Sequence, residues 1–97
     1  MNHRYAMQIV GLVSGGVTPF DGEFVKEYDP NRDGVDPNGD PMLAHIVTTP
    51  DISEAIHMTF VEFHELWTKV DERTPIRPDG KPNRPLTAFT VTTVRVS

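Results

Sequence analysis

Oxygen-bearing side chains recur at short intervals between residues 29 and 40, in a pattern that could hold a hard divalent cation. Asp29, Asn31 and Asp33 stand two residues apart, Gly34 follows them, and Asp40 occupies the twelfth position. This spacing matches the first half of a calcium-binding loop, in which oxygens at positions 1, 3 and 5 converge and glycine at position 6 allows a sharp turn. The pattern therefore suggests a weak calcium site made by Asp29, Asn31, Asp33 and Asp40.

The second half of the segment departs from a calcium loop. An aspartate at position 12 has a shorter side chain than the usual bidentate glutamate, and Asp36 stands where such loops carry an apolar anchor. The flanking segments also have the composition of strands. The alternative is a solvated connection in which Asn, Asp and Gly serve the geometry of turns. We prefer this alternative, and weak calcium binding is the second hypothesis.

The remaining residue types favour no catalytic site. His57 and His64 are seven residues apart, but a helix start predicted at Thr59 separates them, and no histidine pair has the close spacing of a zinc site. The sequence has no cysteine, and its serines lie outside any nucleophile motif. We therefore predict no enzymatic activity and no cofactor. The alternative is an enzyme whose unrecognised site combines a carboxylate with His45, His57 or His64.

The composition is that of a small acidic globular protein. The 97 residues include 9 Lys and Arg against 14 Asp and Glu, which gives a net charge of −5. This size allows one domain, residues 1–97, with a modest core. The negative charge argues against binding nucleic acid, and the longest apolar run, Ile9–Val13, is too short to span a membrane. Because the chain also lacks cysteine and a secretory signal, we expect a cytoplasmic protein.

Charge is distributed unevenly between two proline-containing loops. Residues 29–41 form an acidic loop, which includes Asp33 and Asp36, and residues 73–85 form a basic loop. The cations that we single out in the basic loop are Arg77, Lys81 and Arg84. Complementary charge steers encounter and selects partners, so these five residues are the candidate protein-binding set. The alternatives are that the loops neutralise each other or only keep the surface solvated.

Hydrophobic periodicity predicts an α+β fold that carries these loops. Apolar and β-branched runs predict a small, mainly antiparallel sheet of three or four strands, at about 5–13, 22–28, 43–48 and 87–96. Thr59 and Glu62 form a capping box before a main helix at about 60–70, and a short helical turn is expected at 51–55. The helix is expected to pack one apolar face on the sheet, made by Phe60, Phe63, Leu66, Trp67 and Val70.

The last predicted strand has two further implications. Its apolar residues change face part-way along, which predicts a bulge or a twist near Thr92 and Thr93. Its valine-rich, alternating pattern could also let it pair edge to edge with a second copy of the chain.

Several segments form a recognisable set: Tyr28–Pro30, Thr48–Asp51 with Ala55 after it, Trp67 and the long segment Arg77–Phe89. In these segments, which spread over most of the chain, the sequence resembles small uncharacterised proteins of bacteriophages, prophages and bacteria. The resemblance implies work inside a bacterial cell and brings no known activity with it. Together with the charged loops, it leads us to expect a phage-encoded, non-enzymatic module that binds a host or phage protein.

Overall fold

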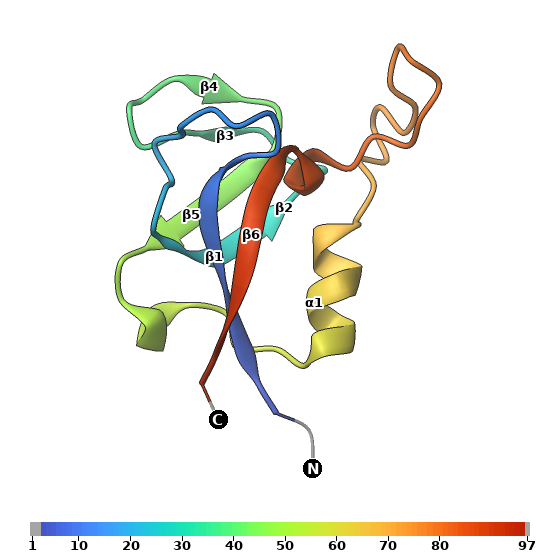
Figure 1. Ribbon diagram of the computed structural model, residues 1–97. Helices are drawn as coiled ribbons and strands as arrows, with labels where there is room; N and C mark the ends of the chain where they lie inside the picture. Colours follow the sequence, from blue (N-terminus) through green and yellow to red (C-terminus); the bar gives the residue numbers. More distant parts are fainter. Residues whose placement is uncertain (1–2, 97) are drawn as a thin grey trace.

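A four-stranded antiparallel sheet forms the centre of the computed structural model, which describes residues 3–96 (Figure 1). In the order β5-β2-β1-β6, its strands are β5 (His45–Thr49), β2 (Phe24–Asp29), β1 (Tyr5–Leu12) and β6 (Phe89–Arg95). A separate hairpin pairs the short strands β3 (Gly34–Val35) and β4 (Pro41–Met42). The helical elements in residues 3–96 are α1 (Phe60–Trp67) and two 3-10 turns, η1 (Ile52–Glu54) and η2 (Pro85–Ala88). The predicted α+β fold is confirmed.

The helix begins where its capping box places it. The Glu62 amide donates to the Thr59 hydroxyl at 3.3 Å, and the Thr59 amide donates to the Glu62 carboxylate at 3.0 Å. This second bond lowers the pKa of Glu62. The helix ends at Trp67, earlier than predicted, because Thr68 leaves helical geometry and its hydroxyl donates to the His64 carbonyl at 2.7 Å.

The apolar face of α1 packs on the sheet only in part. Phe63, Leu66 and Trp67 are half-buried against the core, but Phe60 is 59% exposed and α1 has no fully buried residue. The Phe60 ring lies edge-on against Tyr5, with the ring centroids 5.3 Å apart. A helix of eight residues has little more than two turns, so it is too short to lay the whole predicted stripe on the sheet.

The core lies between the inner faces of β1, β2 and β6 and the turn η2. Leu86 of η2 is completely buried, and Phe20, from the connection between β1 and β2, packs edge to face on Phe89 at 5.7 Å between ring centroids. The buried apolar residues of the sheet and its connections include Met7, Ile9, Val25, Ala44, Ile46 and Met58. The segment that follows the basic loop is therefore part of the core.

The irregularity in the β1–β6 pairing lies on β1. Thr92 and Thr93 pair in regular register with β1, whereas the register shifts between Ile9 and Leu12. Gly11 lies in this interval with φ of +122°, a conformation that glycine adopts without steric cost. The bulge predicted near Thr92 and Thr93 is wrong, because the glycine on the partner strand takes up the extra residue. β6 lies at one edge of the sheet, and its pairing with a second copy stays a prediction.

Candidate functional site

The basic loop, which we call the basic arm (residues 73–85), extends away from the sheet beyond the end of α1 (Figure 1). Its two sides are joined by backbone hydrogen bonds, from the Arg77 amide to the Lys81 carbonyl at 2.8 Å and from the Asn83 amide to the Pro75 carbonyl at 2.8 Å. A turn at its tip is closed by the Gly80 amide, which donates to the Arg77 carbonyl at 2.9 Å. The arm is thus an ordered hairpin-like element whose side chains face solvent.

The cations of the arm differ in how they are compensated. The Arg77 guanidinium pairs with Asp79 of the same arm at 2.9 Å. Lys81 and Arg84 are exposed and form no ion pair with any carboxylate in residues 3–96. Two positive charges of the predicted binding set therefore stay available to another molecule.

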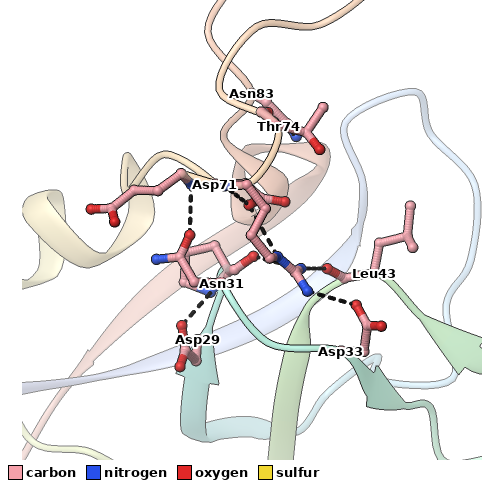
Figure 2. A network of polar contacts seen from close by, with 10 residues as sticks. Asp29, Asn31, Asp33, Leu43, Asp71, Thr74 and Asn83 are labelled. Atoms are coloured by element: carbon pink, nitrogen blue, oxygen red, sulfur yellow. Dashed lines mark hydrogen bonds and ion pairs between the residues drawn. The ribbon is translucent and has the colours of Figure 1, made fainter.

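Arg73 fixes the base of the arm through its contacts with Asp33, Leu43 and Asp71. Figure 2 shows these three partners at the junction between the arm and the sheet. The Nη1 of Arg73 donates to Asp33 at 2.8 Å, and its Nη2 donates to the carbonyls of Pro30 at 3.0 Å and Leu43 at 2.6 Å. Its Nε donates to Asp71 at 3.3 Å, so every nitrogen of the guanidinium is used. The carboxylates of Asp33 and Asp71 raise the pKa of Arg73 above its ordinary value. This one side chain joins the arm to the acidic loop.

Asp71 is a buried residue that stabilises the same junction by its contacts with Arg73. The residue is only 4% exposed, and its carboxylate accepts the Arg73 amide at 2.9 Å. Desolvation acts to raise the pKa of Asp71, but the hydrogen bonds and charge of Arg73 outweigh it and hold this pKa below its usual range. The carboxylate therefore stays ionised and positions the arginine. Sequence reasoning missed this role, since an Asp and an Arg two residues apart are common on protein surfaces.

The predicted calcium ligands are not brought together as a metal site. Asp29 accepts the Asn31 amide at 2.9 Å, the Asn31 side chain accepts the Glu72 amide at 2.6 Å, and Asp33 pairs with Arg73. Within residues 3–96 no group of three or more Asp, Glu or His side chains could hold a metal ion, so Asp40 does not join the other two carboxylates. The calcium prediction is corrected because these side chains form turns and the junction with the arm.

The acidic loop meets the basic arm only at its base. Asp33 is engaged by Arg73, whereas Asp36 turns its carboxylate to the amides of Asn38 and Asp40, both at 2.9 Å. This arrangement shapes the tip of the β3–β4 hairpin. Of the two predicted acidic binding residues, Asp33 is thus a structural partner of the arm, and Asp36 lies at a tip with no cation paired to it in the described chain.

The histidines proposed for an unrecognised enzyme site lie apart. His45 on β5 comes within 3.5 Å of Glu27 on β2 without forming a hydrogen bond to it. The His57 ring contacts the Ile52 carbonyl at 2.8 Å, and His64 lies on the exposed side of α1. Across residues 3–96, the pair of His45 and Glu27 is the one histidine–carboxylate contact within ion-pair distance.

Two hollows flank the segment that leads from the arm into β6. The first has a volume of about 600 Å³ and lies between the end of β1 and the arm, with Arg77 and Arg84 in its wall beside apolar Leu12, Pro85 and Ala88. The second, of about 400 Å³, lies between the arm base and the start of β5 and is lined mainly by apolar side chains, among them Met42, Leu43, Ile46 and Phe89. The first hollow combines an apolar surface with Arg84 and with Arg77, whose guanidinium is already paired with Asp79. This combination suits an anionic segment that meets Arg84 and has an apolar side chain.

No family model, no curated protein and no solved structure matches this chain. In the part of the chain that the structure describes, no helix is both long enough and apolar enough to cross a membrane.

Tyr28 links the end of the arm to the sheet, and its buried hydroxyl predicts that stability depends on alkaline pH. Its hydroxyl accepts the Leu86 amide at 3.2 Å, and burial is the main cause that raises its pKa from 10.0 to about 12. Between these two values the unfolded chain loses the phenolic proton while the folded chain keeps it. Stability is therefore expected to fall as the pH rises through this window, and to be unaffected by this group below it.

Urea unfolding midpoints measured across this pH window test the expectation. In Tyr28→Phe the part of the decline that belongs to Tyr28 should disappear, although the variant should be less stable throughout because the buried Leu86 amide loses its acceptor. A variant whose midpoint declines with pH as steeply as that of the wild type would contradict the assignment.

Proposed function

We propose that this protein is a non-enzymatic binding module whose basic arm engages an acidic surface of another protein. The observation that carries the proposal is an arm held by its own hydrogen bonds and by Arg73, on which Lys81 and Arg84 have no ionic partner within the described residues. A binding element that is ordered before it meets its partner avoids part of the entropic cost of association. Its positive charges increase the encounter rate with a negative surface and select against positive ones.

The hollow beside the arm supports the same proposal. Most of the binding energy of a protein interface comes from a few anchors that fill pockets. The apolar wall formed by Leu12, Pro85 and Ala88 offers such a pocket, and Arg77 and Arg84 stand next to it. A partner that inserts an apolar side chain here could place a neighbouring carboxylate against a guanidinium, where charge-assisted hydrogen bonds are strongest.

The proposed partner is a host or phage protein in the bacterial cytoplasm. This part of the proposal rests on the resemblance of Arg77–Phe89 to small phage and bacterial proteins. The same segment forms most of the arm and the whole of η2. One of the segments that carry the resemblance thus also forms most of the proposed binding surface.

A pull-down from bacterial lysate tests the module. The wild-type chain is compared with a triple variant, Arg77→Ala, Lys81→Ala and Arg84→Ala, and with a charge-matched control that replaces the exposed Arg32, Lys26 and Lys69. We expect a bound protein that is recovered with the wild type and the control and is lost, by roughly tenfold or more, with the arm variant. Equal recovery with all three chains would contradict the proposal.

A further inference from the structure

The tip of the β3–β4 hairpin carries two aspartates, whose charge is opposite to that of Lys81 and Arg84 on the basic arm. Val35 is 61% exposed, and the carboxylates of Asp36 and Asp40 have no ion pair with any cation in residues 3–96. The tip turn is closed by the Asp36 and Gly39 amides, which donate to the Asp40 and Asp36 carbonyls, both at 2.9 Å. An exposed valine thus stands beside two carboxylates that have no cationic partner among residues 3–96, on an ordered turn.

The root of this hairpin lies in close contact with the chain around the start of β5. At Gly34 an added Cβ would lie 2.8 Å from the Ala44 carbonyl oxygen and 2.9 Å from the His45 Cα, so the hairpin lies directly against the start of β5. One residue before Gly34, Asp33 holds Arg73 at the base of the arm. The two charged elements therefore project from neighbouring points that Asp33 and Arg73 join.

Within one molecule the two tips do not compensate each other. Arg77 pairs with Asp79 of its own arm, and the contact between an arm cation and the acidic loop is the one made by Arg73 at the base. Figure 1 shows the β3–β4 hairpin and the arm extending from the fold in different directions. An oppositely charged partner for each tip therefore has to come from another molecule. A second copy of this chain carries the charged groups that both tips require.

We infer that the β3–β4 hairpin of one copy docks into the hollow beside the basic arm of a second copy, head to tail. Val35 would lie on the apolar wall near Leu12 and Pro85, and Asp36 and Asp40 would meet Lys81 and Arg84. This inference rests on the proposed function, because it uses the same arm and names a second copy of this chain as its partner. A head-to-tail contact uses two different surfaces, so it leaves one of each unoccupied at the ends or closes into a ring.

Sedimentation velocity with two one-sided variants tests the contact. One variant is Asp36→Asn with Asp40→Asn, which keeps an oxygen at position 36 to accept the Asn38 and Asp40 amides and removes both negative charges. The other is Lys81→Gln with Arg84→Gln. At low ionic strength we expect the wild type to associate as its concentration rises and to return to monomer at high salt, since screening weakens contacts between exposed charges. Each variant alone should associate at least roughly tenfold more weakly.

The decisive sample is an equimolar mixture of the two variants. The arm of the first and the hairpin of the second are intact, so the mixture should form a one-to-one dimer and nothing larger. A wild type that stays monomeric overturns the inference, as do variants that associate like the wild type or a mixture that forms no dimer. Edge pairing of β6 between copies would survive in both variants and is distinguished in this way.

Self-association and the pull-down together distinguish a failure of this inference from a failure of the proposed function. Circular dichroism and thermal unfolding of each variant establish that it is folded before its association is measured. If the wild type is monomeric but the arm still captures a lysate protein in the pull-down, the proposed function stands and the inference fails. If neither occurs, both fail.

Discussion

Replacing Leu86 with alanine is expected to lower the free energy of unfolding by about 2–5 kcal/mol, because the substitution opens a cavity that the surrounding side chains fill only in part. Leu86 has no exposed surface and belongs to the turn that connects the basic arm to β6. Its amide also donates to the buried Tyr28 hydroxyl, so movement of the turn into the cavity would disturb that bond. The loss should be large for a domain of this size.

Urea unfolding of Leu86→Ala and of Leu43→Ala provides the measurement and its matched control. Leu43 is 82% exposed, and the same chemical change there should alter the free energy of unfolding by less than about 0.5 kcal/mol. Comparable losses in the two variants would show that η2 does not close the core. The comparison also reports on the arm, because its last residues lead directly into this turn.

Replacing Arg73 with lysine is expected to loosen the basic arm and to lower the melting temperature, by on the order of 5–10 °C for a domain of this length. The change keeps the positive charge, so a loss cannot be explained by net charge. A lysine ammonium cannot reproduce the fork of donors with which Arg73 contacts Asp33, Asp71 and two carbonyls at once. Asp71 would then be left buried with weaker compensation.

Hydrogen exchange and thermal unfolding of Arg73→Lys test this expectation together. The Asn83 and Arg77 amides, which are bonded across the arm, should exchange faster than in the wild type. Arg77→Lys is the matched control, since its guanidinium contacts a single carboxylate on the exposed arm and its loss should change stability little. Unchanged exchange across the arm in Arg73→Lys would contradict an anchoring role.

The parts of the fold that depend on neighbouring residues could be predicted from the sequence. Alternation located the four long strands to within a few residues, and the pairing of Thr59 with Glu62 located the start of the helix, because capping involves residues three apart. Which apolar side chains of the helix contact the sheet could not be predicted in the same way. The apolar stripe of the helix continues beyond Trp67, but the helix ends there, where the Thr68 hydroxyl donates to the His64 carbonyl. At the opposite end of the helix, Phe60 lies largely in solvent.

The sequence identified the cations of the candidate site. It did not indicate the contacts that hold the arm in place. Arg77, Lys81 and Arg84 lie exposed on one arm, and their role in binding a partner stays a prediction. The contacts that fix this arm join Arg73 to partners 30 to 43 residues away, and nothing local to the sequence signals them. The calcium pattern failed for a related reason, since Asp and Asn serve a turn, an ion pair and a metal equally well until their neighbours in space are known.

The pairing of β1 has a consequence for how the chain folds during synthesis on the ribosome. β1 pairs with β2 only around Gln8 and Phe24, but with β6 it pairs along most of its length, from Tyr5 to Leu12. A nascent chain must therefore hold its first strand without its main partner until residues near 95 have left the exit tunnel. The pairing of β1 with β6 closes a loop that includes nearly the whole sequence. Contacts between residues so far apart in the chain form slowly, so we expect this pairing to limit the rate of folding.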